Sequence, residues 1–154
     1  MAAEVLVVDD DPDIRALVAM ALENAGFSVR QSADGRSALA TIETQAPDVV
    51  VLDVNMPGMD GYEVVRRMRQ ENETSHTKVL MLTTALGERD RLRALGDGAD
   101  EYLTKPYEPA ALVQMVEWLA RSSDEERAAG RQAEVEKAEL LDRLEAAFAS
   151  RPSA

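Results

Sequence analysis

The sequence contains no cysteine, which excludes disulfide bonds, thiol nucleophiles and zinc sites with thiolate ligands. It also lacks an excess of basic residues. The chain has 29 acids and 17 bases, and its net charge of −12 repels phosphate backbones. We find no local basic patch and expect no direct binding of nucleic acid. The only histidine, His76, lies in a polar segment and is expected to be solvated.

Long apolar runs are absent as well. No stretch approaches the roughly 20 apolar residues needed to cross a membrane, and residues 1–8 lack the basic start and cleavage site of a secretory signal. We therefore expect a cytoplasmic protein without membrane insertion. The 154 residues fit one ordinary domain with an appendage of about thirty residues, and the 45% hydrophobic content is typical of a globular protein.

The most informative stretch is residues 49–61, an apolar run that ends in a carboxylate followed by a turn. Residues 49–52 are all valine or leucine, which predicts a strand buried on both faces, as in parallel sheets covered by helices. Asp53 ends that strand, and Pro57-Gly58 marks a turn. Taken alone, Asp53 is either a strand-ending cap or a group placed for chemistry, since ligands of open α/β sheets bind at the carboxyl ends of strands.

Strands and helices are expected to alternate along the chain. Apolar runs predict five strands, and helical periodicity bounded by capping and breaking residues predicts a helix after each of them. This alternation specifies an α/β fold, a doubly wound parallel sheet with helices on both faces. The expected strands are 5–8, 27–31, 49–53, 79–83 and 101–104, and the expected helices start at Pro12, after Asp34, after Gly61, near Arg89 and at Glu108.

Such a fold gathers polar side chains from four strands at one rim of the sheet. They are Asp9, Asp10, Asp53, Thr83 and Lys105. Two like charges about 4 Å apart cost about 4 kcal/mol at an effective dielectric of about 20, so the carboxylates need a cation. Oxygen ligands favour Mg²⁺ over zinc. With an ammonium and a hydroxyl nearby, the site suits transfer of a phosphoryl group to Asp53 as the nucleophile.

These residues resemble the receiver domain of bacterial two-component response regulators, a phosphoacceptor module with a flavodoxin-like fold. The resemblance covers about residues 4–121 and implies a five-stranded parallel sheet in the order 2-1-3-4-5. The marks that carry it are Asp9-Asp10 after the first strand, residues 53–61, Thr83, residues 98–102 and Lys105-Pro106.

The resemblance also implies a role for each site residue. Asp53 would be the phosphorylation site, and Lys105-Pro106 would be a cis peptide. The Mg²⁺ ligands would be Asp10 and Asp53, Asp9 in an outer shell, and the backbone carbonyl of Asn55. The residues that contact the phosphoryl group would be Thr83 and Lys105, with Tyr102 moving between exposed and buried positions as Thr83 moves. Asn55 and Ala85 occupy positions that tune hydrolysis in the family.

The implied function is a signalling switch rather than an enzyme with an external substrate. The donor would be the phosphohistidine of a histidine kinase or histidine phosphotransfer protein, and the switched face would control a downstream output protein. One alternative is a Mg²⁺-dependent phosphohydrolase that acts through an aspartyl-phosphate, but such enzymes carry an acid where this chain has Asn55. A DNA-binding regulator is a third class, but residues 122–154 carry eight acids and five bases rather than a basic helix-turn-helix.

The expected switch face includes the acids Asp97, Asp100 and Glu101 before and at the start of the fifth strand. In receivers that dimerise through this face, such acids are matched by basic residues on the fifth helix. Here the inner turns of that helix have no arginine or lysine. We therefore expect a heterologous partner on this face, with Met115 and Trp118 as exposed apolar anchors.

Residues 122–154 lie outside the resemblance and are expected to form a helical extension to the receiver domain of residues 1–121. Ser122 and Ser123 start two overlapping capping boxes, Gly130 is a possible interruption, and Pro152 ends the helix. One interpretation is a marginal, solvated helix. The other is a docked helix, on its own receiver, on an output protein or on a second copy as a homodimer. Its apolar residues are Val135, Leu140, Leu141, Leu144, Ala147 and Phe148.

Overall fold

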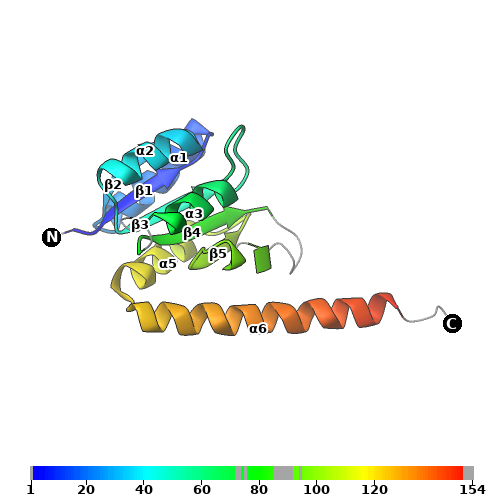
Figure 1. The fold of residues 1–154 in the computed structure, drawn as a ribbon. Coiled ribbons are helices and arrows are strands. Elements are labelled where there is room, and N and C mark those ends of the chain that lie inside the picture. Colours follow the sequence, from blue (N-terminus) through cyan, green and yellow to red (C-terminus); the bar gives the residue numbers. More distant parts are fainter. Residues whose placement is uncertain (1, 72–73, 75, 85–91, 94, 151–154) are drawn as a thin grey trace.

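The computed structural model describes residues 2–71, 74, 76–84, 92–93 and 95–150. Five parallel strands form one sheet in the order β2-β1-β3-β4-β5, which confirms the predicted fold class (Figure 1). The strands are β1 Glu4–Val8, β2 Ser28–Ser32, β3 Val49–Asp53, β4 Lys78–Thr83 and β5 Glu101–Thr104. The helices are α1 Pro12–Asn24, α2 Gly35–Thr44, α3 Gly61–Gln70, α5 Pro109–Arg121 and α6 Asp124–Ala149.

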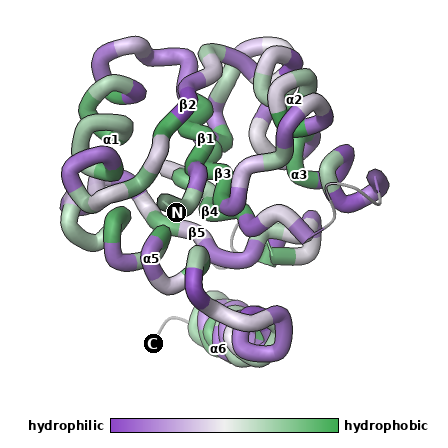
Figure 2. The backbone as a smooth tube through the Cα atoms, turned by 90° about the vertical axis from the view of Figure 1, so that its left-hand side faces the viewer, coloured by the Kyte–Doolittle hydropathy of each residue, from purple (hydrophilic) through white to green (hydrophobic). Residues whose placement is uncertain are grey.

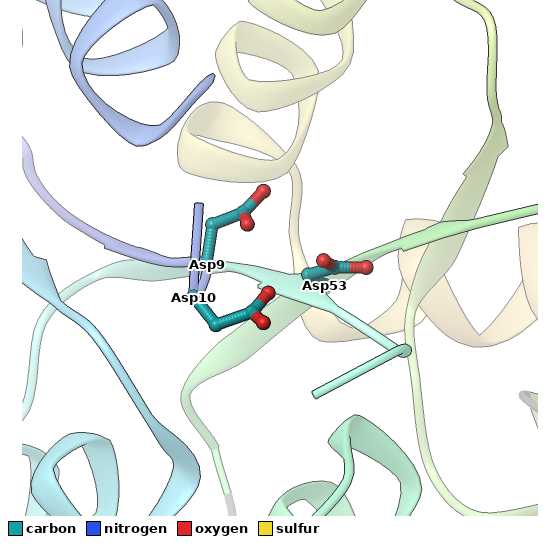
Figure 3. A group of neighbouring side chains, drawn as sticks. All are labelled: Asp9, Asp10 and Asp53. Atoms are coloured by element: carbon teal, nitrogen blue, oxygen red, sulfur yellow. The ribbon is translucent and has the colours of Figure 1, made fainter. Parts of the chain in front are cut away.

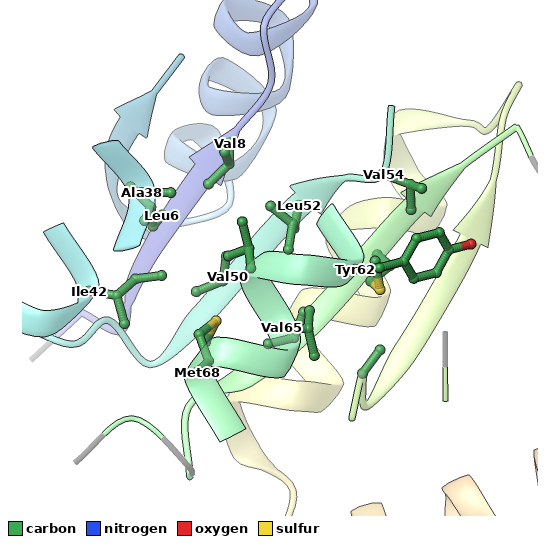
Figure 4. Close-up of a cluster of buried hydrophobic side chains, with 14 of the residues drawn as sticks. Leu6, Val8, Ala38, Ile42, Val50, Leu52, Val54, Tyr62, Val65 and Met68 are labelled. Carbon is green, nitrogen blue, oxygen red and sulfur yellow. The ribbon is translucent and has the colours of Figure 1, made fainter. Parts of the chain in front are cut away.

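The sheet has an apolar layer on each face. Figure 2 shows α1 and α5 on one side of the strands and α2 and α3 on the other. Every residue of β3 is buried, as expected for a central strand covered on both faces. Alternate residues of the strand point to opposite faces, so Val50 and Leu52 pack against the α2 and α3 side (Figure 4), whereas Val49 and Val51 pack against the α1 and α5 side.

Aspartates cap the first three helices. The side chains of Asp11, Asp34 and Asp60 each accept hydrogen bonds from backbone N–H groups in the first turn of α1, α2 and α3. Strand β2 starts one residue later than expected and β4 one residue earlier. A helix was expected near Arg89. The described residues of this segment that are helical are Leu92, Arg93, Leu95 and Gly96. Arg89, Ala85 and Pro152 lie outside the described residues.

Helix α6 is continuous from Asp124 to Ala149, so the interruption considered at Gly130 does not occur. Ser123 and Glu126 form the predicted capping box at its start. Figures 1 and 2 show that α6 lies beside β5 and α5, with its C-terminal half extending past the sheet. This half exposes three large apolar side chains, Leu140, Leu144 and Phe148. None of the described helices is long and apolar enough to span a membrane.

Candidate phosphoacceptor site

Three carboxylates converge at the carboxyl ends of β1 and β3. Asp9 and Asp10 follow β1, and Asp53 is the last residue of β3 (Figure 3). One carboxylate oxygen from each of the three lies within 4.8 Å of the others. Asp9 and Asp53 are buried and Asp10 is exposed. The parallel pairing of β1 with β3 therefore brings together acids that are more than forty residues apart in the sequence.

The acidic cluster is electrostatically unfavourable without a cation. Burial raises the pKa of the Asp9 carboxyl above its ordinary value, and repulsion from Asp53 and Asp10 adds to the rise. One oxygen of Asp9 accepts a hydrogen bond from the Asp11 N–H at 2.9 Å. Its other oxygen, Oδ2, is buried and has no hydrogen-bond partner among the described residues. An unsatisfied buried carboxylate oxygen beside two other carboxylates fits a hard cation such as Mg²⁺.

Lys105 supplies one positive charge inside the site. Its Nζ lies 3.0 Å from Asp53 Oδ1, and both side chains are largely removed from water. The backbone N–H of Lys105 donates to the carbonyl of Thr83 at 2.7 Å, so β4 helps to position the lysine. The peptide bond between Lys105 and Pro106 is cis, as the family resemblance implied. Thr83 itself is buried at the carboxyl end of β4.

The turn after Asp53 packs tightly against the end of β3. The Asn55 N–H donates to Asp53 Oδ1 at 3.1 Å, and the Asn55 side-chain amide donates to Thr84 Oγ1 at 2.9 Å. A Cβ atom at Gly61 would lie only 2.7 Å from the Asp53 carbonyl oxygen. Only glycine permits the start of α3 to approach so closely. Gly58, with φ of 77°, completes the turn.

Two neighbours of the site were not predicted from the sequence. Arg15 on α1 donates from Nη1 to the Asp9 carbonyl at 2.8 Å and so anchors the acidic turn. Tyr107 lines the same pocket as Lys105, and burial raises the pKa of its hydroxyl above the ordinary value, with the negative charges of Asp9 and Asp53 adding to the rise. A tyrosine just after Lys105-Pro106 could have suggested this, but its distance from Asp53 depends on the path of the chain after β5.

An apolar pocket of about 300 Å³ borders the site between α1 and α5. It is lined by Leu17, Pro106 and Leu112 among others, and Lys105 is part of its wall. Two α1 side chains at this pocket remain in contact with water, with exposed fractions of 37% for Ile14 and 66% for Leu17. The apolar side of α1 thus continues from the core to the surface.

The expected apolar anchors on α5 are not exposed. Met115 and Trp118 are half-buried and pack against the core on that side of the sheet, so this prediction is wrong. Trp118 lies beneath α6, because a Cβ at Gly130 would be 3.5 Å from its Cη2 atom. Asp100, also expected on an open face, is only 4% exposed. Tyr102 is buried, and its hydroxyl donates to Glu134 on α6 at 3.3 Å.

Comparison with known proteins identifies the family. The response regulator receiver domain family matches residues 5–117, which include the acid cluster and Lys105. The chain belongs to this family. Its regulator relatives include RpaA, a DNA-binding dual master transcriptional regulator of Synechocystis. RpaA is 39% identical over 132 residues, 85% of this chain and 54% of RpaA. The transcriptional regulatory protein TcrA of Mycobacterium tuberculosis is 44% identical over 117 residues, 76% of this chain and 46% of TcrA.

Solved structures agree with this assignment. The chemotaxis response regulator CheY4 of Vibrio cholerae is 38% identical, with a TM-score of 0.73 over 77% of this chain and 99% of CheY4. Against the transcriptional regulators, this receiver chain spans about half of their length. The family assignment does not favour the phosphohydrolase alternative, since these relatives are regulators.

Proposed function

We propose that this receiver accepts a phosphoryl group on Asp53 and uses the change in charge as a signal. The observation that carries the proposal is the contact of 3.0 Å between Lys105 Nζ and Asp53 Oδ1 inside a cluster of three carboxylates. Asp53 is the member of the cluster that has both a cationic partner and two neighbouring acids able to hold a metal.

The reaction moves a phosphoryl group from nitrogen to oxygen. An oxygen of Asp53 forms a bond to phosphorus while the bond from phosphorus to the donor's imidazole nitrogen breaks, and the imidazole keeps the electron pair. Lys105 offsets the negative charge on the transferred group, and the Thr83 hydroxyl at the next strand end donates to one of its oxygens. We expect Thr83 and Tyr102 to report the modification to the rest of the domain.

Mg²⁺ would be held by Asp10 and Asp53, by Asp9 in the outer shell, and by the backbone carbonyl of Asn55. When bound, the ion supplies positive charge that stabilises the phosphoryl group during transfer. The buried, unsatisfied Asp9 Oδ2 and the mutual repulsion of the three acids support this assignment.

The phosphoryl donor would be a phosphohistidine on a histidine kinase or a histidine phosphotransfer protein. Its docking face would be the apolar pocket between α1 and α5, because the wall of this pocket includes Lys105 and continues directly to Asp53. The exposed Leu17 would be a main contact for a helix of the donor.

The receiver comprises residues 1–121, and residues 122–154 are an extension that contains α6. A downstream output protein responds to phosphorylation. The chain works in the cytoplasm, turns over no external substrate, and does not contact nucleic acid directly, in keeping with its net charge of −12. The exposed Leu140, Leu144 and Phe148 offer a homodimer contact in the extension.

Phosphorylation with acetyl phosphate tests the proposed chemistry without a cognate kinase. We expect intact-mass measurement to show one added phosphate on the wild-type chain when Mg²⁺ is present and none after chelation. Asp53→Asn keeps the size of the side chain and should gain none. Asp13→Asn, which removes an exposed acid on α1, is the matched control and should behave as wild type. Equal labelling of Asp53→Asn and wild type would refute the assignment.

A further inference from the structure

Helix α6 is attached to the receiver by an unusual group of charges around Asp100. This carboxylate lies just before β5 and is 4% exposed. Its Oδ2 accepts from Arg69 Nη2 at 3.0 Å and from the Val79 N–H at 2.8 Å. Its Oδ1 accepts from Arg131 Nη1 and lies 3.8 Å from Arg127 Nε. One buried acid therefore contacts three arginines, two of which belong to α6.

The same helix has further contacts that favour one docked position. The Arg127 guanidinium is 6% exposed and also donates to the Ser122 carbonyl and to Asp124. One turn past Arg131, Glu134 accepts from the Tyr102 hydroxyl at 3.3 Å. Buried, charge-assisted hydrogen bonds of this kind are costly to break when one partner is removed.

Strand β5 connects this group of contacts to the phosphoacceptor site. Asp100 and Tyr102 contact α6, and Lys105, directly after the strand, contacts Asp53. The four residues of β5 span only about 13 Å. Any shift of Lys105 or Tyr102 that follows a new phosphoryl group therefore acts on the strand to which α6 is attached.

We propose that α6 is the resting occupant of the β5 and α5 face, attached through Asp100 to Arg127 and Arg131, and that phosphorylation of Asp53 releases it. The coupling rests on the proposed function, whereas the docking does not. Because coupling is reciprocal, release of α6 also changes the stability of the phosphorylated state.

Hydrogen exchange of the α6 backbone amides tests the docking in the unphosphorylated chain of 154 residues. If the α6 amides exchange only after the helix undocks, their exchange rate is proportional to the fraction of undocked molecules. Arg131→Gln removes a charge-assisted bond to Asp100 and is expected to speed exchange roughly tenfold. Arg143→Gln changes an exposed arginine on the same helix and should match wild type. Tyr102→Phe removes only the hydroxyl that donates to Glu134 and should raise the exchange rate less than Arg131→Gln does. Equal exchange in Arg131→Gln and Arg143→Gln would overturn the docking.

The coupling is tested on the wild-type chain treated with acetyl phosphate and Mg²⁺, with Asp53→Asn treated in the same way as control. Phosphate gain is read by mass, and the release of α6 by faster exchange of residues 124–149. We expect faster exchange in the phosphorylated wild type alone. A chain that carries one phosphate and keeps its resting exchange overturns the coupling while the proposed function stands. A chain that gains no phosphate refutes the proposed function and the coupling together, and the Arg131→Gln result still decides the docking.

Discussion

Glu101 makes the stability of this protein depend on pH in a way that a single substitution can isolate. Its carboxylate lies between β5 and α6, where it faces Glu134 and Lys137 of the helix and Asp100 of its own segment. Burial, followed by repulsion from Glu134 and Asp100, raises the pKa of Glu101 from its ordinary value of 4.5 to about 7. The folded chain therefore prefers the protonated form of Glu101.

The sign and size of the effect follow from this rise. Because the folded pKa is above the unfolded one, the contribution of Glu101 is fully present below pH 4.5 and is lost as the pH rises through about 7. The whole rise corresponds to ~3 kcal/mol, but the carboxylate keeps some contact with water, so we expect about 1–2 kcal/mol after solvent screening. Glu101→Gln, which cannot ionise, should be more stable than wild type by this amount above pH 7.

Urea unfolding followed by circular dichroism, carried out near pH 4.5 and near pH 8, measures the difference between the two proteins. The advantage of Glu101→Gln should be present at the higher pH and close to zero at the lower one. Contributions of acids that do not interact with Glu101 are common to both proteins and cancel. Glu139→Gln, at an exposed position of α6, is the matched control and should show no pH-dependent difference. An advantage of Glu101→Gln that is equal at both pH values would refute the reasoning.

Two further predictions concern α6 and α1. Gly130→Ala should raise the free energy of unfolding by roughly 0.5–1 kcal/mol, because alanine favours the helix more than glycine does. The added Cβ would lie 3.5 Å from Trp118, which is an ordinary contact. Urea unfolding measures the change, and a loss of stability would contradict the described packing. Leu17→Ser should slow phosphotransfer from a phosphohistidine protein roughly tenfold while leaving labelling by acetyl phosphate unchanged, because only the protein donor needs the apolar face. Equal slowing with both donors would argue against that docking face.

The sheet and the site could be predicted because the strands follow from local sequence patterns and the site follows from the parallel order of those strands. The valine run before Asp53 defines a buried strand, and parallel topology brings strand ends together, so Asp9, Asp10 and Asp53 meet as expected. The contact between Lys105 and Asp53 follows from the same rule. These inferences needed only periodicity and the family pattern.

Docking of α6 on its own receiver was one of the two expected outcomes, but most of the side chains that make the contacts were not predicted. Apolar periodicity pointed mainly to the C-terminal half of the helix. Of those apolar residues Val135 packs against the receiver core, whereas the hydrogen bonds come from Arg127, Arg131 and Glu134. Long charged side chains carry no periodic signal, and their partner Asp100 is about thirty residues away in sequence. The exposed anchors expected on α5 were wrong for the same reason, since nothing in the pattern of α5 shows that α6 covers Trp118.

The order of the strands has a consequence for solubility. Both β2 and β5 are edge strands, and an uncovered edge offers unpaired backbone groups to the edge of another molecule. At β2 the edge carries Arg30, a charge that discourages such pairing. At β5 the neighbouring element is α6 (Figure 2). While the helix is docked, it stands beside β5 where the edge of another molecule would have to pair, so the same helix that contacts Asp100 and Tyr102 also blocks access to this edge.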